Sequence, residues 1–274
     1  MRTALLLILT ASLACFAKDP EFKAEDVVAR HLDSIGTAQA RAAARSRLAQ
    51  GTCGMNVIVG GGGGLSGDAL LVSLDRKANL TLKFPSTQYP GEQFVVDGNR
   101  VAVAQTGPNT RSSLGDFVYR HNEILKEGLL GGTLFTSWSL LDLPSRQPRL
   151  KYEGLKRVND RQLHVIRYQP RKSSDEFSIL LYFEPGTFRH VMTAYSYTVP
   201  ASMSMRQTAE RRRPDAHADQ VRYRLEESFS DFRTVDGLTL PRSWKLRYTV
   251  EPADTSILDW QINLTRVVHN TVVD

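Results

Sequence analysis

The histidines and acidic residues could support catalysis or bind a metal, and their spacing in this sequence favours neither. No His-Glu-x-x-His pair occurs, which is the helical spacing by which two imidazoles share a zinc ion. His121 and Glu123 are only two residues apart, and residues two apart on a helix face different ways. We therefore expect no metal site and no cofactor. The histidines are His31, His121, His164, His190, His217 and His269.

One pair of carboxylates has the spacing of a general acid and base. Glu123 and Glu127 are four residues apart, so a helix would place them on one face. Such a pair more often belongs to a solvated surface than to an active site. No Gly-x-Ser-x-Gly nucleophile motif occurs either. We predict that the chain is not an enzyme. An envelope hydrolase, built from Asp116 and His121 with these glutamates, is a third hypothesis.

The glycine run at residues 60–64 does not have the features of a phosphate-binding loop. A P-loop ends in Gly-Lys-Ser/Thr, whereas Leu65, Ser66 and Gly67 follow here and lead into a strand pattern. We predict a hairpin connection instead. Cys53 lies in the preceding strand pattern, and we expect it to be a small buried residue.

The first residues have the pattern of a secretory leader. A positive start with Arg2 precedes a short apolar run, and small residues follow up to Ala17. We predict a signal peptide over residues 1–17, cleavage after Ala17 and a periplasmic mature protein. A lipid anchor through Cys15 is a less favoured alternative, because Ser12 stands where a lipobox has leucine. No later stretch is apolar enough to span a membrane.

The net charge of +6 is mild and dispersed. The densest cluster, residues 211–213, lies in a polar stretch that we predict to be an extended loop over residues 203–219. Nucleic-acid binding would need a basic face with interleaved aromatic residues, and an exported protein would not meet nucleic acid. Affinity for anionic lipid headgroups stays open.

The hydrophobic pattern predicts two short helices followed by a long series of strands. Apolar residues recur at helical spacing over 24–35, Gly36 ends that pattern, and Thr37 can cap a second helix through Ala44. From residue 46 the period changes to two. Turn signals at 97–99, 159–160, 185–186 and 236–237 separate successive strands, which indicates an antiparallel meander. The predicted strands cover residues 47–59, 69–74, 79–84, 93–96, 101–105, 163–168, 177–183, 191–197, 221–232, 240–250 and 258–267, and the β pattern resumes at 149.

The region between the two groups of strands has a different pattern. Residues 116–127 are predicted to be helical, and an apolar, glycine-rich run follows, with a second short helix over about residues 133–141. No linker or composition shift divides the chain, so we predict one domain over residues 18–274. The fold class is mostly β (α+β): a strongly curved antiparallel sheet forming a half-barrel, with helices on its concave face.

One strand pattern indicates what that sheet must cover. Phe177, Ile179, Leu181 and Phe183 share one side of their strand, and this side is wholly apolar. A curved sheet can bury such a face by wrapping around its own interior. The interior is then either filled by side chains or left as an apolar cavity, and periodicity does not distinguish the two.

Four stretches resemble the periplasmic outer-membrane lipoprotein-sorting (LolA/LolB-like) superfamily. They are residues 24–36, the Phe-Val-Val-Asp-Gly at 94–98, the Leu-Lys-Tyr-Glu-Gly at 150–154 and residues 229–241. Their order along the chain resembles that of a distant member of the superfamily. The resemblance implies a half-barrel with a hydrophobic hollow that carries lipids or lipid-modified proteins without a cofactor.

We therefore predict a periplasmic protein that binds or carries a lipid, acyl chain or lipoprotein in an apolar cavity. Gly128, Gly131 and Gly132 would act as hinges of a lid over that cavity. The alternative is a structural or adaptor protein of the cell envelope, with a filled core and a protein partner. The predicted ligand-binding residues are Phe84, Phe94, Val96, Phe117, Ile124, Leu125, Leu129, Leu130, Phe135 and Trp138.

Overall fold

The computed structural model describes residues 22–59, 63–172, 177–199, 220–251 and 256–271, and its main element is one antiparallel sheet of 12 strands. The predicted leader and the predicted loop over 203–219 lie outside the described residues. The strands are β1 (Ser46–Val59), β2 (Gly64–Leu74), β3 (Lys77–Lys83), β4 (Gly91–Asp97), β5 (Arg100–Val103), β6 (Arg149–Val158), β7 (Arg161–Gln169), β8 (Phe177–Phe183), β9 (His190–Val199), β10 (Val221–Val235), β11 (Leu238–Glu251) and β12 (Ser256–His269).

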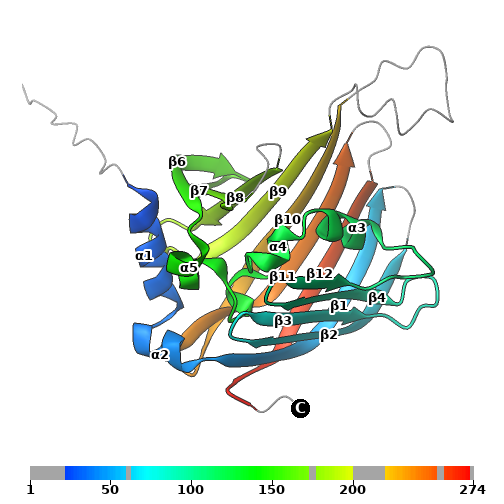
Figure 1. Cartoon of the computed structure of the whole chain (residues 1–274), viewed down its shortest axis with the longest axis horizontal. Coiled ribbons are helices and arrows are strands. Elements are labelled where there is room, and N and C mark those ends of the chain that lie inside the picture. The colour runs from blue at the N-terminus through cyan, green and yellow to red at the C-terminus, as the bar shows by residue number, and fades with distance from the viewer. Residues whose placement is uncertain (1–21, 60–62, 173–176, 200–219, 252–255, 272–274) are drawn as a thin grey trace, which may run out of the picture.

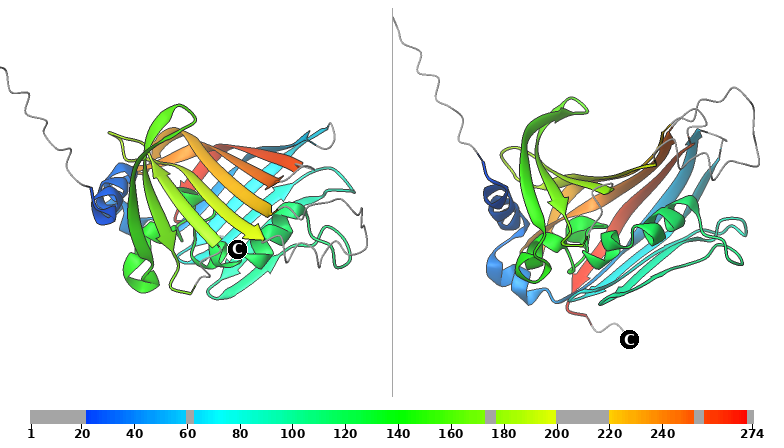
Figure 2. Two further views of the ribbon diagram at one scale, coloured as in Figure 1. Left: turned by 90° about the horizontal axis from the view of Figure 1, so that it is seen from above. Right: turned by 45° about the horizontal axis from the view of Figure 1, so that its top comes forward.

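The sheet consists of two meanders joined by one pair of strands that are far apart in sequence. The spatial order is β5-β4-β3-β2-β1-β12-β11-β10-β9-β8-β7-β6, so only the β1–β12 pairing joins strands that are not consecutive. These two strands stay paired over most of their length, with register shifts at Gln50/Gly51 and at Val57/Val59. The sheet curves strongly without pairing β5 to β6, as the predicted half-barrel requires (Figures 1 and 2).

The order of the strands also explains the position of the central helices. β5 and β6 follow one another in the chain, yet they form opposite edges of the sheet. The chain between them, residues 104–148, must therefore pass from one edge to the other. We call it the crossing segment, and Figure 2 shows it on the concave side of the sheet. It contains α3 (Ser113–Arg120), α4 (Glu123–Lys126), the 3₁₀ turns η1 (Gly132–Leu134) and η2 (Ser139–Asp142), and α5 (Leu143–Arg146).

Two N-terminal helices lie at one end of the half-barrel. The helix α1 (Ala24–Ile35) buries the predicted apolar stripe, including His31. Gly36 ends it next to the β10–β11 turn, where a Cβ atom would lie 2.4 Å from the Gly237 carbonyl oxygen. The helix α2 (Ala38–Ala43) begins as predicted, because the Thr37 side chain accepts a hydrogen bond from the Ala40 amide at 3.1 Å. Neither helix is long enough to be stable without packing on the sheet.

The crossing segment differs from the two helices predicted for it. The helix expected over 116–127 is broken between α3 and α4, because the Asn122 side chain donates to the Tyr119 carbonyl at 3.1 Å. That carbonyl would otherwise accept the next helical bond. The break brings His121 Nδ1 within 3.7 Å of Glu123 Oε1, although the continuous helix predicted that they face apart. The helix expected over 133–141 is replaced by η1 and η2, with Phe135 extended between them.

Other sequence predictions are confirmed. All four turn signals connect paired strands of the sheet, as at Asp97–Arg100 between β4 and β5. The apolar side of the strand at 177–183 is buried in the main core. Cys53 is a buried free thiol, and burial raises its pKa to about 11. Among the described residues, no helix combines the length and apolar composition that crossing a membrane would require.

The bulge in the β1–β12 joint gives a first prediction. A Cβ atom at Gly51 would lie 1.9 Å from the backbone oxygen of Asn263, whereas one at Gly54 would meet nothing closer than 3.7 Å. Gly51→Ala must therefore push two paired strands apart, and we expect it to lower the free energy of unfolding by about 1–3 kcal/mol. Gly54→Ala in the same strand is the matched control and should change it little. Urea denaturation of both variants measures the difference, and equal midpoints would contradict this account of the joint.

Candidate functional site

The ten residues predicted to bind a ligand are all buried in one apolar core. Phe84 follows β3, Phe94 and Val96 lie on β4, and the other seven belong to the crossing segment. The structure therefore brings the predicted sheet face and its predicted cover into contact. Whether these residues bind a ligand stays a prediction.

The space between these two layers is nearly full. The gap between β3, β4 and the crossing segment has a volume of about 20 Å³, lined by side chains that include Leu80, Phe94, Leu130 and Phe135. This is about the space of one water molecule and far too small for an acyl chain. The side chains of the crossing segment occupy the hollow themselves.

Larger spaces lie towards the two ends of the crossing segment. One, of about 430 Å³, lies between α1, α2, the β2–β3 turn and the residues around η1 and η2. The other, of about 190 Å³, lies between α3 and strands β9 to β11, where Tyr197, Tyr223 and Tyr248 line it beside His121. The packed centre thus has accessible volume on both sides.

Two buried charged side chains of the sheet hold the middle of the crossing segment. Glu227 of β10 accepts hydrogen bonds from the Gly131 amide and from the Tyr195 hydroxyl, each at 2.7 Å. Arg47 of β1 donates to the Thr133 carbonyl through Nη1 and to His269 Nε2 through Nε. These contacts satisfy buried backbone groups of the irregular part of the crossing segment.

The glycines predicted as lid hinges are part of this packed conformation. Gly128, Gly131 and Gly132 have φ values of +66°, +77° and +51°, which favour glycine over other residues. A Cβ atom at Gly128 would lie 1.9 Å from the Ser137 carbonyl oxygen. The three glycines therefore permit the closed arrangement, and a hinge motion at them remains a prediction.

A histidine–tryptophan cluster connects the crossing segment to α1. The Trp138 indole donates to His31 Nε2 at 3.1 Å, and His31 Nδ1 donates to the Phe188 carbonyl at 3.1 Å. The His190 ring stacks on Trp138 with centroids 4.8 Å apart. Burial lowers the pKa of His31 to about 4, so it accepts from the indole as a neutral imidazole. His31 is thus a hydrogen-bonded core residue.

The residues of the hydrolase hypothesis do not converge on one site. Asp116 pairs with Arg120 at 2.7 Å, and Glu127 accepts from the Tyr168 hydroxyl at 2.7 Å. Asp116 and His121 line the same 190 Å³ space, but of the four residues only His121 and Glu123 lie within ion-pair distance of one another. Across the described ranges, no group of three or more His, Cys, Asp and Glu side chains could hold a metal ion.

Arg47 and Glu227 are functional residues that were not predicted from the sequence, although the sequence contains a signal for Glu227. In β10 the inward positions alternate as Leu225, Glu227 and Phe229, so a carboxylate stands in an otherwise apolar row. Such a residue needs a buried partner. Its partner could not be read from sequence, because Gly131 lies 96 residues away.

These features define a half-barrel protein whose concave face is covered by its own crossing segment. No protein-family model and no curated protein matches the chain. It is similar to the solved structure of a LolA superfamily protein from Nitrosomonas europaea, at 12% identity, 92% coverage of this chain, 96% of that chain and a TM-score of 0.46. It is also similar to a domain assigned to outer membrane lipoprotein sorting from Vibrio parahaemolyticus, at 11% identity, 92% and 95% coverage and a TM-score of 0.46.

Glu227 gives a prediction about pH. Burial raises its pKa to about 7 from the usual 4.5, so between these values the folded state binds more protons than the unfolded state. Its contribution to the free energy of unfolding must therefore fall as pH rises through this window. Glu227→Gln should remove this pH-dependent loss. We therefore expect the free energy of unfolding of the variant to rise by about 2 kcal/mol relative to that of the wild type between pH 4.5 and pH 7.

Chemical denaturation of both proteins across this pH range measures the gain. The low pKa of His31 makes both proteins less stable as pH falls below 6.5, so the difference between them isolates Glu227. Parallel pH profiles for the two proteins would contradict the assignment.

Proposed function

We propose that this chain is a periplasmic binding or carrier protein that holds a lipid or acyl chain between the concave face of its sheet and the crossing segment. The observation that carries the proposal is that, apart from the two-turn helix α3, only short helical turns cover the apolar concave face. α4, η1, η2 and α5 contain three or four residues each. Helices of this length are not stable by themselves, so their arrangement depends on the contacts beneath them. The periplasmic location rests on the predicted leader.

The balance of energies sets a requirement on the ligand. Each buried methylene contributes about 0.8 kcal/mol, so roughly ten methylenes contribute about 8 kcal/mol. Against this stand hydrogen bonds of about 1 kcal/mol each at Gly131 and Thr133, and the loss of burial of side chains such as Leu130 and Phe135, about 1.5–3 kcal/mol each. Only a long chain can offset displacement of several such side chains.

This requirement gives a prediction on chain length. We expect a fatty acid of about sixteen carbons to bind and one of about eight carbons to bind far more weakly, since the seven apolar carbons of the shorter acid correspond to only about 6 kcal/mol. Displacement of a fluorescent fatty acid and native mass spectrometry of the periplasmic protein measure this. No uptake at either length, together with no lipid that co-purifies, would overturn the proposal.

A variant of the crossing segment tests where the chain lies. Phe135→Ala removes a side chain that fills the hollow, so we expect it to increase the affinity for the sixteen-carbon acid several-fold while lowering stability by about 3–5 kcal/mol. Phe135→Leu gives the same direction with less loss of stability. Met192→Ala is the matched control, because Met192 belongs to a separate cluster of buried residues. An equal gain in the control would mean that lost stability alone increases binding.

The filled centre also favours a second candidate function. An adaptor protein of the envelope would keep its core closed and use a surface or a free sheet edge, and Leu155 on the edge strand β6 is 52% exposed. This candidate predicts a purified protein without lipid whose stability does not change when fatty acids are added.

A further inference from the structure

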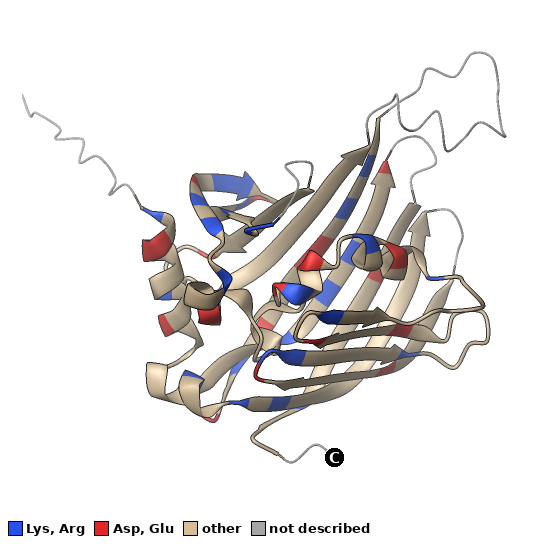
Figure 3. Cartoon of the chain, in the orientation of Figure 1, with Lys and Arg blue, Asp and Glu red and all other residues tan. Residues whose placement is uncertain are grey.

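The 430 Å³ cavity next to α2 has a different character from the apolar centre. Its volume is within the range of small-molecule sites. Its walls include four arginines, two aspartates and an apolar surface, and Figure 3 shows the basic positions on the ribbon of this region. The arginines are Arg41, Arg45, Arg47 and Arg76, the aspartates are Asp75 and Asp142, and the larger apolar residues are Leu32, Ile35, Leu141 and Leu238.

Two of the arginines donate to uncharged acceptors. Arg41 donates through Nη1 to the carbonyls of Leu32, at 2.6 Å, and of Gly36. Arg47 donates to the Thr133 carbonyl and to Nε2 of His269. The Asp236 carboxylate bonds to the other ring nitrogen of His269 and not to Arg47 itself. Burial lowers the pKa of Arg47 to about 10, so it remains charged at neutral pH. Carbonyls satisfy the donors of these side chains without neutralising their charge.

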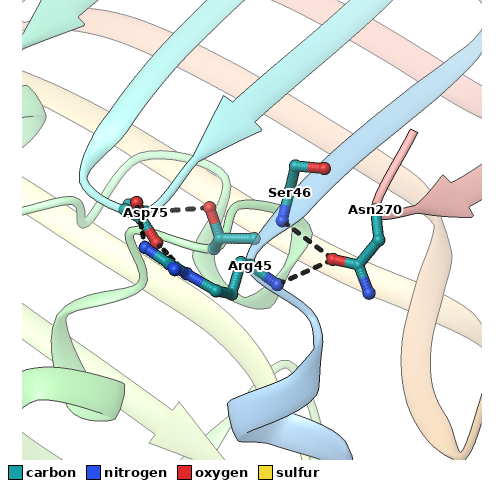
Figure 4. A network of polar contacts seen from close by, with 5 residues as sticks. Arg45, Ser46, Asp75 and Asn270 are labelled. Carbon is teal, nitrogen blue, oxygen red and sulfur yellow. Dashed lines mark hydrogen bonds and ion pairs between the residues drawn. The ribbon is translucent and has the colours of Figure 1, made fainter. Parts of the chain in front are cut away.

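The carboxylates of the cavity do not compensate for this charge. Asp75 is engaged by Arg45, whose Nε and Nη2 donate to its two oxygens at 3.0 and 2.9 Å (Figure 4). The carboxylate of Asp142 accepts from the Ser145 hydroxyl. Arg76 forms neither a hydrogen bond nor an ion pair with any residue that the structure describes. Four arginines against two aspartates leave an excess of two positive charges.

The cavity also adjoins the covered concave face. Thr133 and Thr136 line it, and they belong to the part of the crossing segment that Arg47 and Ser73 hold against the sheet. Leu32, Ile35 and Leu238 supply apolar wall beside the guanidinium groups. A ligand that fits both kinds of wall has an anionic group and an apolar chain.

We propose that this cavity binds the phosphate group of an anionic lipid whose acyl chain extends beneath the crossing segment. Arginine suits this role, because its guanidinium donates two parallel hydrogen bonds to phosphate oxygens. Arg76 is the free guanidinium of the site, and Arg41 and Arg47 supply fixed positive charge around it. The inference rests on the proposed function and specifies the class of lipid.

The test compares ligands that share one acyl chain. Binding of a sixteen-carbon lysophosphatidic acid, the matching monoacylglycerol and inorganic phosphate is measured by calorimetry on the mature protein. We expect the lysophosphatidic acid to bind about tenfold more tightly than the monoacylglycerol, a ratio typical of one hydrogen-bonded charge. Arg76→Gln should reduce this ratio several-fold, and Arg76→Glu should abolish it. Arg100→Gln is the matched control, because Arg100 is exposed at the start of β5 and does not line the cavity, and it should leave the ratio unchanged.

The possible failures are distinguishable. Equal affinities for the two lipids, or a ratio that Arg76→Gln leaves unchanged, would overturn the headgroup site and leave the proposed function intact. Absence of binding by both lipids would overturn the proposed function and this inference together. Inorganic phosphate that binds in an Arg76-dependent way without either lipid would show a free-anion site and overturn the lipid assignment.

Discussion

β1 pairs with β12, although these strands lie at opposite ends of the described sheet sequence, and this pairing determines the arrangement of the sheet and of the crossing segment. The two meanders, β1–β5 and β6–β12, are joined side by side through this pair. As a result, β5 and β6 form opposite edges of one sheet. Consecutive strands at opposite edges require a long connection, and the curved sheet offers its concave face as the apolar surface for it to cover. The cover of the half-barrel is therefore tied to the sheet at both ends.

Buried polar groups determine where that segment lies. Glu227 and Arg47 form hydrogen bonds with the backbone of Gly131 and Thr133. His31 accepts a hydrogen bond from the indole of Trp138. Each would be costly if left without a partner, so they favour one position of the segment over others. The raised pKa of Glu227 adds a cost at neutral pH, where this carboxylate becomes ionised. The closed state is thus specific, and burying Glu227 costs most at neutral pH, where its carboxylate is ionised.

The fold was largely predictable from local signals, and the site only in part. Turn residues such as Asp97-Gly98 and the alternation at 177–183 act between neighbours, so they specify a meander and its inward face. The break between α3 and α4 depends on the Asn122 side chain, which hydrogen-bonds to the Tyr119 carbonyl. The spacing of apolar residues does not indicate such a bond. The basic cavity gathers Arg41, Arg47 and Arg76 from different elements, and the crossing that completes it follows from the β1–β12 pairing. Contacts between residues that are far apart in the sequence leave no pattern in the local sequence.

The proposed function requires that an acyl chain takes the place of side chains of the crossing segment on the concave face. Photo-cross-linking with a sixteen-carbon fatty acid that carries a diazirine near its methyl end, followed by mass spectrometry of the peptides, tests this most directly. The account predicts adducts on β4 around Phe94 and Val96 and on the crossing segment around Leu130 and Phe135, with protection by unlabelled acid. Adducts confined to exposed surface, or none that unlabelled acid prevents, would contradict it.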